Sequence, residues 1–231
     1  MALLRPSEPW AQTAEQAAQR VGFRANAELA LRNAMEGFAR QRWPNARICH
    51  EMMMGERKVR ADMVAIDTAH IAAFEVKGDY DNTTRLLHQV GMYQLCVPEV
   101  WMVVPVGHAK DARLIRYLLP SVGLLVGAGQ SKKHSYEFDG KDFGLVVEAE
   151  PGPFKPVPEM ALEMMWRNAL AAICDRTRCY AVSAKSTRPN MIKALLALSF
   201  AQLQREICTE LRARDALWRA DKPVRKNNGG I

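Results

Sequence analysis

Three charged residues lie within apolar stretches that otherwise have the composition of buried β-strands. Asp62 interrupts one apolar run, and Glu75 and Lys77 interrupt the next. Burying a carboxylate costs free energy unless it is paired or binds a metal. If the two runs form a hairpin in which Ile66 faces Ile71, Asp62 stands directly opposite Glu75, and Lys77 shares their face because side chains alternate along a strand. A three-residue turn would shift this register and separate the three side chains.

Two carboxylates that face each other repel, and a divalent cation between them removes the repulsion. Mg²⁺ (or Mn²⁺) favours one or two carboxylates together with water and phosphate oxygens, so Asp62 and Glu75 are the expected metal ligands. Lys77 would stabilise developing phosphate charge, or orient or deprotonate a metal-bound water. The residues therefore predict metal-assisted hydrolysis of a phosphodiester. The alternative is an exposed sheet face whose Glu–Lys pair adds little to stability; apolar flanks on both strands and the basic net charge weigh against it.

The elements that must position these residues follow from hydrophobic periodicity and turn signals. We expect an α/β core over residues 1–150, a Pro-rich linker over 151–158, and a helical C-terminal subdomain with a basic tail over 159–231. Asn82 or Thr83 is the expected N-cap of the second helix. In the core we expect helices over 26–43 and 82–96 and strands over 46–55, 58–67, 70–78 and 99–106. A later hairpin is expected to join 123–129 to 143–150. The expected C-terminal helices are 160–175 and one long or broken helix over 188–220.

The segment "EVKGDYDNTTRLLHQVGMYQLC" is similar to a segment of small bacterial and phage members of the PD-(D/E)XK nuclease superfamily. Those relatives read E-[IV]-K-S-D-x-D-[ST]-x-x-R-L-x-x-Q-x-x-x-Y, and the departure here is Gly78 in place of Ser, which we expect to matter little. The acid of their second core strand corresponds to Asp62, and E-x-K of the third corresponds to Glu75 and Lys77. The resemblance implies a restriction-endonuclease-like core, a mixed central sheet flanked by helices in the order α-β-β-β-α-β. "MWRNAL" and "STRPNMIKALLAL" match further elements of these relatives loosely.

The same resemblance implies roles for residues outside the central three. The carbonyl of Val76 would be a further metal ligand. A further acid from the first helix would be Glu28, with Glu36 as the rival, and Glu51 of the first strand could line the site or face solvent. Gln89 would reach the lysine, the nucleophilic water or a phosphate. Arg85 and Tyr93 are possible additional site residues, Arg85 as a bidentate phosphate ligand or an exposed side chain.

The bulk composition points to a polyanionic partner. The chain has 231 residues and a formal net charge of +7, which favours nucleic acid first and an anionic membrane second. Lys185 and Arg188 precede an expected helix and could meet phosphates at its N-terminus. The five scattered cysteines are expected to be reduced, mostly buried thiols, and the N-terminus lacks a signal-peptide pattern, so a bacterial or phage-infected cytoplasm is expected.

The sequence leaves several alternatives open. A non-catalytic nucleic-acid-binding or interaction protein on the same fold remains the rival to a Mg²⁺-dependent deoxyribonuclease. DNA versus RNA, endonuclease versus exonuclease and the oligomeric state, a homodimer included, stay undecided at this level.

Overall fold

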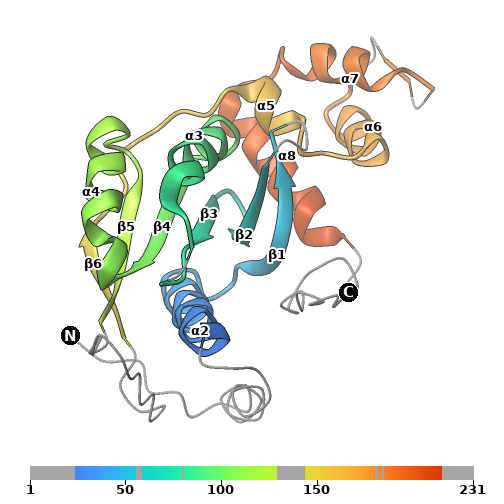
Figure 1. The fold of residues 1–231 in the computed structure, drawn as a ribbon. Coiled ribbons are helices and arrows are strands. Elements are labelled where there is room, and N and C mark those ends of the chain that lie inside the picture. Colours follow the sequence, from blue (N-terminus) through green and yellow to red (C-terminus); the bar gives the residue numbers. More distant parts are fainter. Residues whose placement is uncertain are drawn as a thin grey trace, which may run out of the picture. The chain divides into compact units, whose positions relative to one another are not determined.

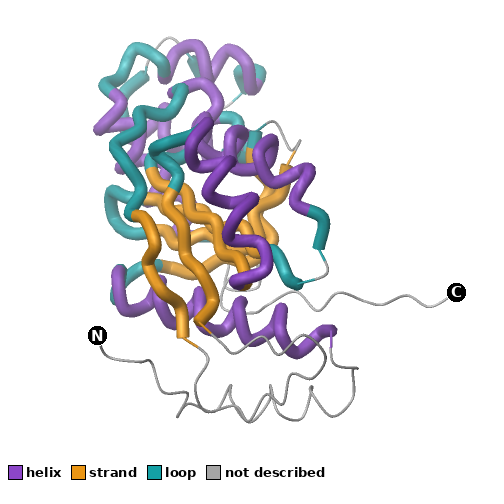
Figure 2. Tube along the Cα trace, turned by 60° about the vertical axis from the view of Figure 1, so that its left-hand side comes forward, coloured by secondary structure: helices purple, strands orange, loops and turns teal. Residues whose placement is uncertain are grey.

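The protein has an α/β fold built on a six-stranded mixed sheet flanked by helices. The structure is a computed structural model that describes residues 24–55, 59–79, 81–128, 144–179, 182–183 and 185–214. The strands follow the order β1-β2-β3-β4-β5-β6 across the sheet (Figure 1), and Figure 2 shows them as neighbouring extended segments. Their bounds are β1 Arg47–Met54, β2 Val59–Ile66, β3 Ile71–Val76, β4 Glu99–Pro105, β5 Gly123–Ala128 and β6 Gly144–Ala149.

The sheet is mixed because it contains both antiparallel and parallel strand pairs. β1 pairs with β2 and β5 pairs with β6 in antiparallel fashion, whereas β4 and β5 are parallel. Parallel neighbours need a crossover connection, which the 3₁₀ turn η2 (Val106–His108) and helix α4 (Ala109–Leu118) provide.

The first of two compact units covers the described parts of residues 24–44, 74–90 and 99–153. Its core contains a cluster of aromatic rings. Phe38 of helix α2 (Arg24–Arg42) lies edge-on to Trp101 of β4, with ring centroids 5.1 Å apart, and Trp101 stacks on Phe74 of β3 at 6.4 Å. The Arg42 guanidinium lies 5.3 Å from the centroid of the Trp101 ring. These packed rings fix the end of β3 that carries Glu75.

The second compact unit covers the described parts of residues 45–73, 91–98 and 154–214. Helix α8 (Phe200–Ala213) packs against β2. The shorter helices α5 (Pro158–Leu162) and α6 (Arg167–Arg176) each contact α8 and also α7 (Arg188–Leu195). Arg47, at the start of β1, donates hydrogen bonds to the carbonyls of Leu211 and Arg212 and so satisfies the C-terminal end of α8.

The turn between β2 and β3 has the geometry on which the predicted register depends. The backbone N–H of Asp67 donates to the carbonyl of His70 at 2.8 Å, which leaves two exposed residues, Thr68 and Ala69, at the tip. If the pairing of Asp67 with His70 continues along the two strands, Ile66 stands opposite Ile71, as expected from the sequence. The opposition of Asp62 and Glu75, further along the two strands, remains a prediction.

Most of the predicted elements are present, and their order up to β4 is the expected one. Helix α3 (Leu86–Cys96) follows a 3₁₀ turn, η1 (Thr83–Arg85), that Asn82 caps by accepting a hydrogen bond from the Thr84 N–H. The predicted single helix over 160–175 is wrong: the chain breaks between α5 and α6, where Trp166 is extended and forms the N-cap of α6. The long C-terminal helix is broken, because Ser199 caps a new helix by accepting from the Gln202 N–H.

Helix α4 was not expected from the sequence, although its buried residues Ala109, Ala112 and Ile115 recur every three positions. The predicted domain boundaries at 151–158 remain a prediction, and the compact units group β1 and β2 with the C-terminal helices. The loop "SKKHSYEFDGKD" and the basic tail lie outside the described residues. All five cysteines are free thiols, and four of them are buried. No helix in the described part of the chain combines the length and apolar character needed to cross a bilayer.

Candidate functional site

Three of the predicted site residues meet in the first compact unit. The ammonium group of Lys77 lies 2.6 Å from Oε1 of Glu75 and donates to Oε1 of Gln89 at 2.9 Å. The amide nitrogen of Gln89 donates to the same Glu75 oxygen at 2.6 Å. Glu75 is 2 % exposed and Lys77 7 % exposed. Each side chain therefore holds the other two, in surroundings with little water to weaken their interaction.

The backbone around these residues explains why they converge. Glu75 lies in β3, where every residue is buried, and the Lys77 N–H continues the sheet beyond the strand by donating to the carbonyl of Val103 in β4 at 2.9 Å. Lys77 shares the face of Glu75 because side chains alternate along extended backbone. Gln89 reaches them from the first turn of α3.

The turn after Lys77 is held by contacts of Gly78 with Asp81 and with His108. Asp81 accepts from the Gly78 N–H through its carboxylate at 2.9 Å and returns its own N–H to the Gly78 carbonyl at 3.1 Å. The same carbonyl lies 3.0 Å from Nε2 of His108 in η2. These contacts fix the chain directly beyond Lys77. Neither this role of Asp81 nor the contact of His108 was predicted from the sequence. The turn could have been recognised from an Asp three residues after a Gly, since Asp side chains commonly bond to nearby backbone in turns.

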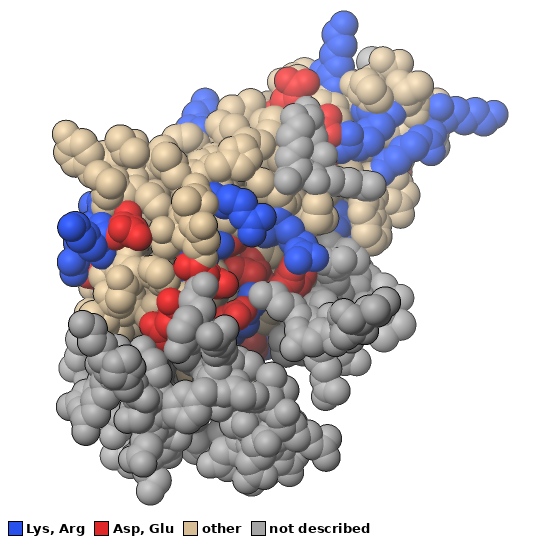
Figure 3. Space-filling view, viewed as in Figure 1, with Lys and Arg blue, Asp and Glu red and all other residues tan. Residues whose placement is uncertain are grey.

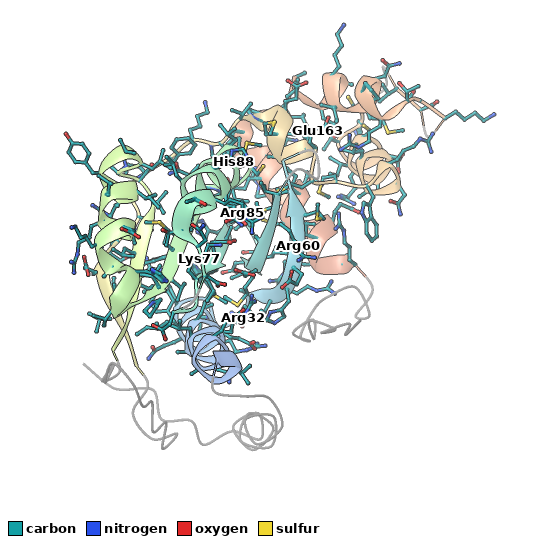
Figure 4. The ribbon with its side chains drawn as sticks, in the orientation of Figure 1. Arg32, Arg60, Lys77, Arg85, His88 and Glu163 are labelled. Atoms are coloured by element: carbon teal, nitrogen blue, oxygen red, sulfur yellow. The ribbon has the colours of Figure 1, made fainter. Side chains whose placement is uncertain are left out.

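Glu28 of α2 lies next to this turn. A Cβ atom on Gly78 would stand 3.4 Å from Cβ of Glu28, which is ordinary contact, so a Ser at this position would fit with little disturbance. Glu28 is half-buried and its carboxylate pairs with Arg32 at 3.1 Å. Figure 4 labels Arg32 on α2 and Lys77 beside it. The rival acid, Glu36, pairs with Arg40 in an exposed contact at 2.9 Å.

The donor atoms in this unit are of the kind that Mg²⁺ or Mn²⁺ binds. The carboxylate of Glu75, the carbonyl of Val76 and the carboxylate of Glu28 are hard oxygen ligands. Both hydrogen bonds from Lys77 and Gln89 end on Oε1 of Glu75. Within the described ranges, no three His, Cys, Asp or Glu side chains form a ready metal-binding group. The metal site therefore stays a prediction.

Three further predicted residues lie in the second unit. Asp62 is partly buried on β2. Glu51 of β1 is 5 % exposed, has a positive φ of 56°, and pairs with Arg60 at 2.7 Å. Tyr93 of α3 is fully buried, and its hydroxyl donates to the carbonyl of Arg60 at 2.7 Å. Tyr93 thus holds the backbone of β2 two residues before Asp62.

The predicted nucleic-acid-binding residues differ in what their side chains do. Lys185 is exposed. Arg188 instead donates to the carbonyls of Glu163 and Met165 and pairs with the Glu163 carboxylate, which fastens the start of α7 to the end of α5. A guanidinium so engaged has few donors left for phosphate. Arg85 is exposed at the end of η1, and Figure 4 labels it near the start of α3.

Comparisons with known proteins give one family. No curated protein and no solved structure matches the chain. The family model for bacteriophage P4 protein cII matches residues 27–220, a span that includes all the site residues discussed above and the four C-terminal helices. Because that match covers most of the chain, this protein belongs to the bacteriophage P4 cII family.

Proposed function

We propose that this protein is a metal-dependent nuclease that hydrolyses DNA phosphodiester bonds on a restriction-endonuclease-like, PD-(D/E)XK core. The observation that carries the proposal is the contact of two buried residues, Glu75 and Lys77, with each other and with the partly buried Gln89. Removing a carboxylate and an ammonium from water costs more than their attraction commonly returns, so a buried pair is a poor device for stability alone. The same pair at the end of a strand fits a site where charge is needed for chemistry.

In this proposal each side chain has a separate task. Glu75, Asp62, the Val76 carbonyl and Glu28 would hold Mg²⁺ or Mn²⁺, which when bound supplies Lewis acidity toward a phosphoryl oxygen. Lys77 would orient the attacking water or stabilise charge on the phosphate. Gln89 keeps the ammonium and the carboxylate in register by bonding to both. The place of Asp62 in this set rests on the sequence register.

A cleavage assay tests the proposal. Linear, circular and single-stranded DNA are incubated with Mg²⁺ or Mn²⁺ and with wild type, Lys77→Ala or Lys77→Arg. We expect wild-type cleavage and a loss on the order of 100-fold or more in both variants, because a guanidinium does not reproduce the point charge of an ammonium. Lys77→Arg keeps a buried cation and guards against loss of folding as the cause. Lys110→Ala, at an exposed position on α4, is the matched control and should cleave like wild type.

A second candidate is a nucleic-acid-binding protein that does not cleave. Lys and Arg side chains gather over the α6–α7 part of the molecule in Figure 3, and the net charge is +7. Such a surface supplies affinity for phosphates without any reaction. DNA retained in a gel shift but uncleaved by wild type in both metals would favour this candidate. Equal cleavage by wild type and both Lys77 variants would refute the assigned site.

A further inference from the structure

Glu51 combines two features that a stable strand avoids. It has a φ of 56° in the middle of β1, in the left-handed region where the Cβ of a non-glycine residue is crowded. Its carboxylate is also nearly completely buried, with 7 % of the side chain exposed. Both features cost free energy. An isolated surface ion pair returns too little to explain them.

The partner of this carboxylate is a half-exposed arginine. Nε of Arg60 lies 2.7 Å from Oε2 of Glu51, and 53 % of the Arg60 side chain is exposed. Nε is one of five donors of a guanidinium, so the outer face of the group can still bind an anion bidentately. A buried carboxylate beneath an exposed guanidinium holds that group in one orientation and reduces the entropy lost when it binds.

The backbone beneath Arg60 is also held in place. The hydroxyl of the fully buried Tyr93 donates to the Arg60 carbonyl at 2.7 Å. The residues on either side of Glu51 keep regular antiparallel pairing with β2, which places Glu51 opposite Asp62. Arg60 is thus fixed at its side chain by Glu51 and at its backbone by Tyr93. Figure 4 labels Arg60 at the β1–β2 part of the sheet.

Arg60 and Asp62 lie on the same side of β2. They alternate with buried residues along the strand, and they are its two residues that are not buried. Two residues of extended chain span about 7 Å, comparable to the rise of about two nucleotides in one strand of duplex DNA. We propose that Arg60 is a phosphate-binding residue, oriented by Glu51, that holds the nucleic-acid backbone next to the phosphate at Asp62. This inference rests on the proposed function for the role of Asp62, and Arg60 itself can be tested without cleavage.

The test measures DNA binding in EDTA, where a metal-dependent nuclease does not cleave. Fluorescence anisotropy with a labelled duplex gives Kd at several salt concentrations for wild type, Arg60→Gln and Arg205→Gln. Arg205 is likewise an exposed arginine in the same unit, on α8, and serves as the matched control. For Arg60→Gln we expect about tenfold weaker binding and a slope of log Kd against log salt that falls by about 0.9, the loss of one phosphate contact. Arg205→Gln should change neither.

A second pair of variants tests the orienting role of Glu51. Glu51→Gln and Glu51→Ala remove the same charge, but only Gln keeps an acceptor for the guanidinium. We expect Glu51→Ala to bind DNA several-fold more weakly than Glu51→Gln, and equal affinities would overturn the role of Glu51. The double variant Glu51→Gln/Arg60→Gln leaves no unpaired buried charge, so it separates weak binding from poor folding.

The outcomes distinguish this inference from the nuclease proposal. Wild type that binds DNA but never cleaves, with the expected loss in Arg60→Gln, refutes the nuclease and retains Arg60 as a phosphate ligand. Cleavage by wild type with identical salt slopes for Arg60→Gln and Arg205→Gln retains the nuclease and overturns the inference about Arg60. Absence of DNA binding by wild type overturns it as well.

Discussion

The buried pair of Glu75 and Lys77 predicts that one substitution is more harmful to stability than two. The two side chains are 3 % and 9 % exposed. Lys77→Met leaves the Glu75 carboxylate buried without its cation, and breaking a buried pair in this way costs about 3–5 kcal/mol. We expect the lower end, about 3 kcal/mol, because the Gln89 amide still donates to the carboxylate. The double variant Glu75→Leu/Lys77→Met removes both charges and should recover most of that loss, since apolar replacements of buried pairs are often neutral.

Urea unfolding followed by circular dichroism measures these differences, with the m-values compared so that changes in the unfolded state are recognised. Arg40→Met, which breaks the exposed pair with Glu36 on α2, is the control and should change the free energy of unfolding by about 0.5 kcal/mol or less. A loss below about 1 kcal/mol for Lys77→Met would refute the reasoning, because removal of the ammonium would then leave no costly uncompensated charge on Glu75. A double variant as unstable as the single one would show that the pair itself stabilises the fold.

Two further predictions concern packing and electrostatics in the first unit. Gly123→Ala should lower the free energy of unfolding by about 1–3 kcal/mol, because its Cβ would lie 2.5 Å from the fully buried Trp101 ring. The Cβ of Gly78→Ala would meet only ordinary contacts, so this variant should lose clearly less in the same urea titration. The pKa of the Glu148 carboxyl is lowered from its ordinary value near 4.5, first by the hydrogen bond from Arg113. The stabilisation that this pair supplies is present above that ordinary pKa and is lost as the pH falls through the lower folded value. Carboxyl NMR titration should find the low pKa in wild type and its return toward the ordinary value in Arg113→Gln; an unchanged pKa would refute the assignment.

The predictable part of the site came from residues that interrupt apolar runs. Strands buried on both faces have few reasons to contain charges, so Glu75 and Lys77 were visible as exceptions in the sequence alone. A contact between Gln89 and Lys77 was one of three roles that the family resemblance implied for Gln89, and the structure brings Gln89 to both Lys77 and Glu75. The turn at Asp67 was equally readable, because a short polar segment between two apolar runs leaves few possible registers.

The unpredictable part depended on contacts that have no local pattern. A left-handed Glu51 inside a strand cannot be read from propensity, since Glu has no special preference for that conformation. Arg188 was predicted to meet phosphates at the N-terminus of a helix. Its guanidinium instead binds Glu163 and Met165, residues more than twenty positions earlier in the chain. His108 reaches Gly78 from thirty positions away. Such partners are set by tertiary packing rather than by spacing along the chain.

Two features of the sheet cost free energy, the buried Glu75–Lys77 pair and the left-handed, buried Glu51, and both bear on the choice between the candidate functions. A protein that only presented basic side chains to nucleic acid would gain its affinity from exposed Lys and Arg, and these need neither a buried carboxylate–ammonium pair nor a strained strand residue. Natural proteins depart from local preferences mainly at functional sites. Here the departures are Glu75 with Lys77 at the end of β3, and Glu51 beneath Arg60. Both fix the orientation of a cation, which matters where a cation must meet one particular phosphate oxygen and matters little for nonspecific binding. These two features therefore favour the nuclease over the binding protein.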